Sequence, residues 1–236
     1  MKKKILLIIS AILVLSLASV AAVEIANRNF DFGKKIAEIN NSKDKGEVIA
    51  IVNGEKLFQN SIDGKKLIDS EAAERNKIEL EKIKDTVDEE EYNKIKKSME
   101  PKTDKELFEK LIAQTVIKQD VEKLKITVTK DEIDKAVDES IKVLEDSKND
   151  KSTDFYDDFV ATISGMGYTM EDYKIELLPI AMEGSLLSQR HYEIITEKIK
   201  IENPEDYYKK GKEYYENYVD SLVKNADVEI LNDNFK

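Results

Sequence analysis

The sequence has no cysteine, one histidine, three prolines and eight glycines among its 236 residues. Without cysteine it cannot form a disulfide framework, a cysteine-ligated metal site or the lipid-modified cysteine of a bacterial lipoprotein. The scarcity of glycine and proline, beside 37% charged and 41% apolar residues, disfavours a β-sandwich or barrel. We predict a mostly α fold built from long amphipathic helices.

The sequence also lacks the common motifs of catalysis and cofactor binding. It has no glycine-rich phosphate loop, no serine elbow and no zinc-binding helix motif. The one histidine, His191, lies on a helical segment whose other face is apolar, so we expect a surface or partly packed role. Four consecutive carboxylates, residues 88 to 91, would point around a helix and are interpreted as a solvated first turn. We therefore predict no enzyme activity, catalytic residue, cofactor or metal.

The amino terminus carries three lysines followed by a mostly apolar run over residues 5 to 23. This pattern is typical of a signal peptide or of an N-terminal membrane anchor, and small residues near position 21 would suit a signal peptidase. The length of the run is close to the roughly 20 residues that span a bilayer. Either alternative engages the membrane or the export machinery and places the remaining chain outside the cytoplasmic membrane, secreted or anchored to its outer face.

The net charge of −11 gives the protein an acidic surface. Such a surface argues against nucleic acid or anionic lipid as the main partner, because both carry negative charge. Residues 24 to 45 are polar and rich in Asn and Lys, and we expect them to form a tether between the apolar run and the folded body.

The stretch "VIAIVNGEKL", residues 48 to 57, predicts a short β-hairpin. Its β-branched run is followed by Asn53-Gly54, the pair that best tolerates the positive φ angles of a type I′ turn. Near the other end of the chain, "ADVEIL", residues 226 to 231, alternates enough to be a strand. A lone hairpin is marginal in water, so we expect this late strand to join it.

The chain between these strands predicts a series of helices. The first follows the hairpin and is capped by Asn60 or Ser61. Capping boxes at Thr103 and Thr129 open two further helices, and the first of these carries a wide apolar stripe that predicts a central position. Thr169 caps a helix that Pro179 should kink. A last helix starts at residues 203 and 204 and carries a row of tyrosines.

Apolar and aromatic side chains on the last helices are the best candidates for binding. Tyrosine and methionine can grip varied apolar segments, although packing in the core is the more common role for any one of them. The candidate polypeptide-binding residues are Met166, Tyr168, Tyr173, Met182, Tyr207, Tyr208, Tyr214, Tyr215 and Tyr218.

The order of these elements resembles the SurA N-terminal-domain family, and PrsA-type foldases of Gram-positive bacteria are similar. An export signal, "VIAIVNGEKL", a helix running into "KLKITVTKDEI", then "GYTMEDYKIELLPIAM" and a final "ADVEIL" carry the resemblance. It covers residues 46 to 232. In that family the late strand closes the module beside the first. The parvulin prolyl-isomerase domain that family members often carry has no counterpart here, since only a short polar link follows residue 146.

The resemblance implies an extracytoplasmic, ATP-independent chaperone-like module that binds unfolded or partly folded exported polypeptides and lacks prolyl-isomerase activity. An alternative is an envelope structural or regulatory protein that uses the same fold to bind one dedicated protein partner. The sequence does not decide between them, and it predicts no oligomeric state.

Overall fold

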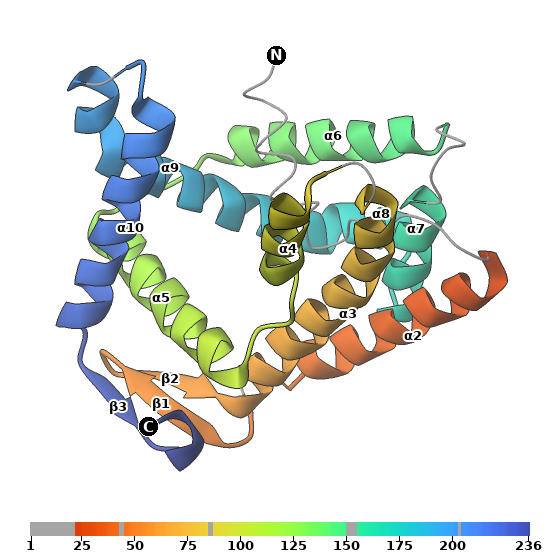
Figure 1. The fold of residues 1–236 in the computed structure, drawn as a ribbon, viewed down its shortest axis with the longest axis horizontal. Helices are drawn as coiled ribbons and strands as arrows, with labels where there is room; N and C mark the ends of the chain where they lie inside the picture. The colour runs from red at the N-terminus through yellow and green to blue at the C-terminus, as the bar shows by residue number, and fades with distance from the viewer. Residues whose placement is uncertain (1–21, 43–44, 85–86, 150–154, 203) are drawn as a thin grey trace.

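The chain folds into a mostly α-helical structure with one small antiparallel sheet, which confirms the predicted fold class (Figure 1). This computed structural model describes residues 22–42, 45–84, 87–149, 155–202 and 204–236. The predicted signal peptide or anchor, residues 1 to 23, therefore lies almost wholly outside the described residues. Of the helices within those ranges, none is long and apolar enough to cross a membrane.

The helices after the hairpin and the late strand follow in the expected order, whereas the helix Ala22–Asn40 was not expected. The elements are α2 (Ala22–Asn40), β1 (Val48–Val52), β2 (Glu55–Phe58), α3 (Gln59–Ile83), α4 (Glu89–Ser98), α5 (Asp104–Lys123), α6 (Lys130–Ser147), α7 (Phe155–Gly165), α8 (Met170–Asp172), the π-helical turn η1 (Tyr173–Leu177), α9 (Leu178–Glu202), α10 (Tyr207–Asn225), β3 (Val228–Ile230) and the 3-10 turn η2 (Asp233–Phe235).

The sheet joins the two ends of the folded body, as predicted. Its strand order is β2-β1-β3, and both pairings are antiparallel. Asn53 and Gly54 have φ angles of 49° and 88°, as the turn between β1 and β2 requires. The Asn53 side chain also accepts a hydrogen bond from the backbone N–H of Asp227, at 2.8 Å, just before β3 begins. The turn therefore helps to hold the late strand in place.

The main apolar core lies between this sheet, α3 and α5. Strand residues Ile49 and Val52 are fully buried, and α5 contributes Phe108. The Phe108 ring stacks on Phe235 of η2 with 4.4 Å between ring centroids. Since α5 also contacts α9 and α10, the predicted central position of this helix is confirmed. We call this core, with its three strands, the clasp.

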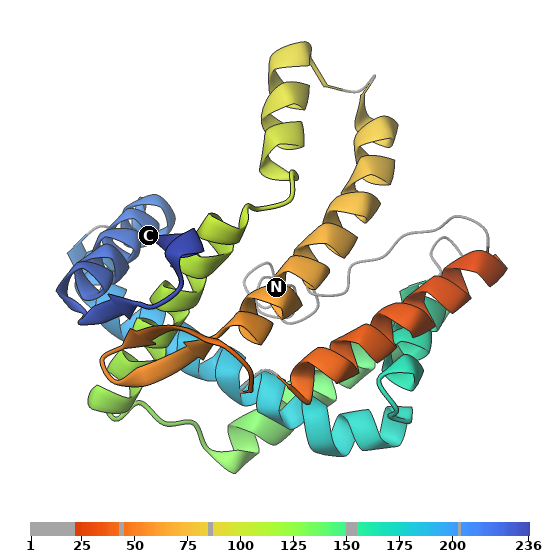
Figure 2. The ribbon, with the colours of Figure 1, turned by 90° about the horizontal axis from the view of Figure 1, so that it is seen from below.

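Residues 24 to 45 do not form the polar tether that the sequence suggested. Most of them belong to α2, which packs along α7 (Figures 1 and 2). The two backbones meet at Gly33 and Gly165, where an added Cβ would lie 2.0 Å from the carbonyl oxygens of Thr162 and Phe30 respectively. The face of α2 that contains Gly33 also buries Asn29 and Phe32. The sequence predicted a tether because this buried face of α2 includes Asn29 and Gly33, which are not apolar residues.

Helices α3 and α4 form a hairpin that projects from the rest of the molecule (Figure 2). Helix α4 has no buried residue, and Asp88 caps it by accepting from the Glu91 backbone N–H at 2.8 Å, so the predicted solvated first turn is confirmed. The predicted cap of α3 is wrong. Strand β2 runs directly into α3, Phe58 takes the N-cap position, and the Asn60 side chain instead donates to the Ser42 carbonyl.

Three helices start at the residues that the sequence predicted. Capping boxes at Thr103, Thr129 and Thr169 are all formed. The kink at Pro179 stays a prediction; the irregularity that the structure shows is η1, a π-helical turn that ends directly before α9. The predicted start of the last helix is wrong, because α10 begins at Tyr207 after a turn over residues 204–206.

Candidate functional site

A buried polar cluster joins α5, α9 and α10. His191 of α9 is completely buried, which corrects the expectation of a surface or partly packed residue. Its Nε2 lies 3.0 Å from Asp120 Oδ2 of α5, and its Nδ1 lies 2.8 Å from the hydroxyl of Tyr215 on α10. The Tyr218 hydroxyl donates to the same Asp120 oxygen at 2.6 Å. Three helices thus meet through four polar side chains.

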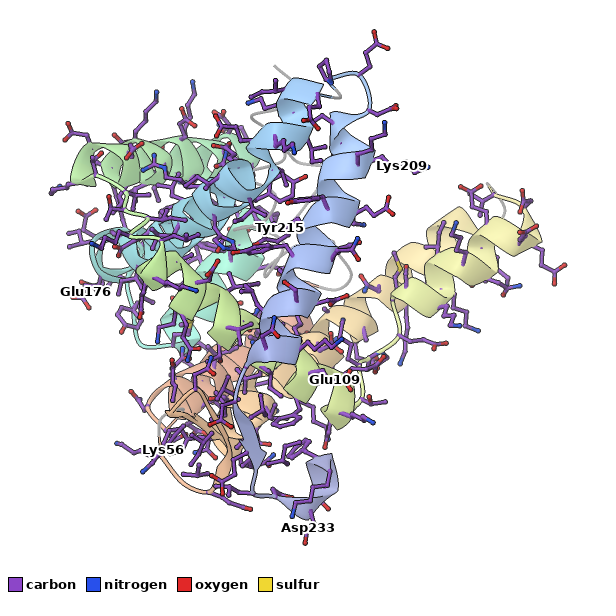
Figure 3. All side chains as sticks on the ribbon, turned by 90° about the vertical axis from the view of Figure 1, so that its left-hand side faces the viewer. Lys56, Glu109, Glu176, Lys209, Tyr215 and Asp233 are labelled. Carbon is purple, nitrogen blue, oxygen red and sulfur yellow. The ribbon has the colours of Figure 1, made fainter. Side chains whose placement is uncertain are left out.

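Helix α10 presents its tyrosines to this cluster because of their spacing. Tyr207, Gly211, Tyr215 and Tyr218 recur at intervals of three and four residues, so they lie on one helix face. Figure 3 shows Tyr215 on the side of α10 toward α9, with Lys209 on the opposite side. The buried Gly211 leaves room for the Tyr192 hydroxyl of α9, which would lie 2.9 Å from an added Cβ. The tyrosine row therefore packs against α9.

The electrostatics of the cluster favour an ionised Asp120 and neutral tyrosines. Burial alone would raise the pKa of Asp120, but hydrogen bonds from His191 and Tyr218 leave it below the usual value. Burial, together with the nearby Asp120 charge, raises the pKa of Tyr215 to about 12. Burial and the hydrogen bond to Asp120 raise the pKa of Tyr218 to about 12 as well. Asp120 is then an ionised acceptor for the Tyr218 hydroxyl, which keeps its proton, and lies 3.0 Å from His191 Nε2.

The cluster is suited to bracing helices and not to acting on a substrate. A histidine oriented by a carboxylate is the arrangement of a general base, but such a base must reach the proton it abstracts. Both ring nitrogens of His191 are engaged within the protein, and the side chain has no exposed surface. We name Asp120, His191, Tyr215 and Tyr218 the polar brace. Elsewhere in the described ranges, no group of three or more His, Asp or Glu residues could hold a metal ion.

Most of the predicted polypeptide-binding residues point into the protein. Met182 is buried against Val137 and Leu178. Tyr173 packs edge-on against Phe159, with ring centroids 5.2 Å apart, and Tyr168 packs on the same cluster. The remaining residues that face inward or are half-buried are Met166, Tyr207, Tyr215 and Tyr218.

Two of the nine predicted residues, Tyr208 and Tyr214, are exposed. They lie to either side of the inward face of α10, and 75% of the Tyr208 surface is accessible. The nine residues therefore do not form one surface. The tyrosine row divides into an inner set, which belongs to the polar brace and its surroundings, and an outer pair that is open to solvent.

Exposed aliphatic side chains on η1 and α9 are a second set of candidates, which the sequence did not lead us to propose. Ile180 and Ile201 are 68% and 73% exposed, and Ile175 and Ile194 are also exposed. The signal was present in the sequence as a spacing of seven. Ile180, Leu187, Ile194 and Ile201 follow one another at that interval, and we name these four residues the α9 row.

Comparison with known proteins gives no match to a family model, to a curated protein or to a solved structure.

Proposed function

We propose that the protein is an extracytoplasmic, ATP-independent chaperone-like protein that binds unfolded or partly folded exported polypeptides. The observation that carries the proposal is the concentration of exposed apolar side chains on one part of the fold. Of the ten large apolar side chains exposed within the described residues, six lie between residues 175 and 214. They are Ile175, Ile180, Ile194, Ile201, Tyr208 and Tyr214.

The physical basis of binding would be burial of this apolar surface against a client. Each square ångström of apolar surface removed from water contributes about 25 cal/mol, so several aliphatic side chains together supply useful affinity. Soluble proteins seldom expose contiguous apolar patches unless something binds there. The acidic net charge of −11 would keep a complex with a client soluble.

Two further features support the proposal. The pairing of β3 with β1 gives the topology that the resemblance to the SurA N-terminal-domain family implies, with the late strand beside the first. Only seven residues separate Ser147, at the end of α6, from Phe155, at the start of α7, which leaves no space for an inserted isomerase domain. The proposed function therefore does not include prolyl isomerisation. The extracytoplasmic location is proposed because of the apolar run at the amino terminus.

The regularity of the α9 row favours a second candidate function, an envelope structural or regulatory protein with one dedicated partner. Four aliphatic residues at a constant interval match a defined helical partner better than a mixture of unfolded chains. The two functions differ in the number of polypeptides that the surface accepts.

Suppression of aggregation tests the proposal. Residues 22–236, which contain every described element, are mixed with several unrelated proteins that aggregate on dilution from denaturant. We expect reduced light scattering for most of them, and a double change, Ile180→Ser with Ile201→Ser, should remove most of the effect. Val143→Ser with Leu124→Ser is the matched control, since these side chains are exposed elsewhere. Protection of only one client, or of none, would overturn the chaperone-like function and leave the dedicated partner as the candidate.

A further inference from the structure

Helix α2 is held against the body along two flanks (Figures 1 and 2). Along one flank it runs antiparallel to α7, because the Thr162 carbonyl approaches Gly33 while the Phe30 carbonyl approaches Gly165. Along the other flank it contacts the first half of α3. We call the contact between α2 and α7 the seam, and its composition determines how firmly α2 is attached.

The seam is made of small and polar side chains. The residues that recur at intervals of three and four on its two faces, all of them buried, are Asn29 and Gly33 of α2 and Asp158, Thr162 and Gly165 of α7. Among the described side chains of α2, Phe32 is the one large apolar group that is buried. The apolar residues that α5 buries are Leu107, Phe108, Ile112, Val116 and Val121. The seam is therefore much poorer in apolar surface than the clasp.

Release of α2 exposes little apolar surface, chiefly that of Phe32. Burial of apolar surface is the main force that holds elements together, so this loss is small. Asn29 and Asp158 exchange their contacts in the seam for contacts with water, which changes the free energy little. On the α3 flank, Arg28 pairs with Glu71 at 2.9 Å, but the Arg28 side chain is 46% exposed and solvent screens the pair. We therefore expect α2 to open at a lower free energy than the clasp.

Most of the same residues have the sequence of a tether and the structure of a helix. Their polar composition predicts a solvated segment, whereas in the structure residues 22 to 40 are helical and docked. Both descriptions hold if α2 docks and releases. Docked, α2 is a rigid element about 28 Å long. Released, residues 22 to 42 can extend to about 70 Å, so the body reaches farther from the amino-terminal apolar run.

We infer that α2 is a detachable strap. Docked in the seam, it fixes α7 relative to α3; released, it becomes the tether that joins the apolar run to the body, while the clasp and the polar brace stay folded. Every named residue of the clasp and the polar brace lies from β1 onward, so neither depends on α2 for its contacts. The inference concerns how the body is attached and does not rest on the proposed function.

Thiol labelling of the full chain in zwitterionic nanodiscs tests release, and the absence of native cysteine gives each variant one reactive group. Thr162→Cys places a thiol in the seam, and Thr115→Cys on α5 is the matched control. Both threonines are buried and donate to the carbonyl four residues earlier, at 3.0 and 2.9 Å. We expect Thr162→Cys to be labelled at least about 100-fold faster in native buffer, with a rate that depends little on low urea. Equal rates with equal urea dependence would mean that α2 opens only when the body unfolds, which overturns the inference.

A substitution in the seam separates docking from helix formation. Gly33→Ala places a Cβ 2.0 Å from the Thr162 carbonyl oxygen but favours the helix itself, and Gly184→Ala on α9 is the control because its Cβ would meet nothing within 4 Å. With Gly33→Ala, labelling of Thr162→Cys should rise at least about tenfold and labelling of Thr115→Cys should not change. Gly184→Ala should alter neither rate. Acceleration at neither thiol, or equal acceleration at both, would show that α2 does not release by itself, and the inference would be wrong.

Distances between spin labels distinguish the docked strap from the tether. The labels are attached to Glu38→Cys on α2 and Asp157→Cys on α7, two exposed positions, and pulsed electron paramagnetic resonance measures their separation in the full chain. We expect one narrow distribution with a minor longer component, and a dominant broad and longer distribution once Gly33→Ala is added. A single narrow distribution in both proteins would show that α2 stays docked. The inference would then fail whether or not the protein suppresses aggregation.

Discussion

The clasp and the polar brace both hold α5 in place, but by different physical means. In the clasp, strands from both ends of the body pack aliphatic and aromatic side chains against α5. In the polar brace, α5 meets α9 and α10 through a carboxylate, an imidazole and two hydroxyls. The clasp closes the chain into one body, and the brace fixes α9 and α10 relative to α5. The surface proposed to bind polypeptide lies on the two helices that the brace positions.

The two regions should differ in how a substitution lowers the free energy of unfolding. Apolar packing stabilises in proportion to buried surface, so truncation in the clasp loses transfer energy and leaves a cavity. A satisfied buried network contributes little net stability, but removing one member leaves the others buried without partners. The clasp should therefore respond to the size of a side chain, and the brace to its hydrogen-bonding capacity and to pH.

The largest effect is expected from Phe108→Ala in the clasp. This change removes a buried ring that stacks on Phe235, and such truncations cost about 3–5 kcal/mol. The free energy of unfolding of residues 22–236 in urea, followed by circular dichroism, measures the loss. Tyr208→Ala serves as the control, because this exposed ring should change stability by less than about 0.5 kcal/mol. Equal losses for the two variants would contradict the packing of the clasp.

The next effect is expected from Asp120→Ala in the brace. His191 and Tyr218 each lose their acceptor while buried, which we expect to cost about 3 kcal/mol. Asp120→Asn keeps an acceptor oxygen and should cost less. The same urea measurement compares the two variants, and a loss from Asp120→Ala no larger than that from Asp120→Asn would show that the hydrogen bonds carry little of the energy.

High pH should weaken the brace while leaving the clasp without a comparable response. Tyr215 and Tyr218 have a pKa of about 12 in the folded protein, above the usual value of 10.0, so the unfolded chain loses their protons first. Their contribution to stability is complete below pH 10 and is lost as the pH rises from 10 through 12. The free energy of unfolding should fall less between pH 10 and pH 12 in the double variant Tyr215→Phe with Tyr218→Phe than in the unchanged protein. If the free energy of unfolding of this variant falls with pH as steeply as that of the unchanged protein, the two hydroxyls do not cause the loss of stability.

The smallest effect is expected at the start of α6. Thr129→Ala removes a capping box and should cost about 1 kcal/mol. The same change at Thr103, which caps α5 in the same way, provides the comparison within the chain. Hydrogen exchange of the first turn of each helix should increase in its own variant alone. Faster exchange throughout both helices would mean that these caps stabilise more than their own first turn.

Local signals in the sequence were sufficient to predict the strands of the clasp. The Asn53-Gly54 turn, the alternation near β3 and the capping residues act over a few positions, so their outcome depends little on the remaining chain. The brace could not be predicted in the same way. His191 and Asp120 are 71 positions apart, and nothing around either residue indicates the other. Likewise, the role of Gly33 in α2 depends on a backbone approach from α7 that only the folded chain reveals.

Most of the candidate binding residues named from the sequence are packed inside the protein, and most side chains of the surface proposed above are others, on η1 and α9. The tyrosines of α10 were predicted to bind because they are large and clustered. The inner ones are packed against α9 and are not available for binding. The exposed aliphatic residues of α9 share their helix with buried Leu178, Met182 and His191. Because α9 contacts both α6 and α10, its sequence shows no single apolar stripe. The spacing of seven can be read from the sequence, but only the structure shows that most of these residues are exposed.

Site-directed photocrosslinking tests the central claim most directly, namely that α9 contacts non-native polypeptide. A photoreactive amino acid replaces Ile180 or Ile201 on the α9 row, or Lys142 on the exposed face of α6 as the control. Each variant is irradiated with an unfolded client and with the same client in its folded state. We predict crosslinks from Ile180 and Ile201 to the unfolded client and none above background from Lys142 or to the folded client. Equal crosslinking from all three positions, or none from the α9 row, would contradict the account.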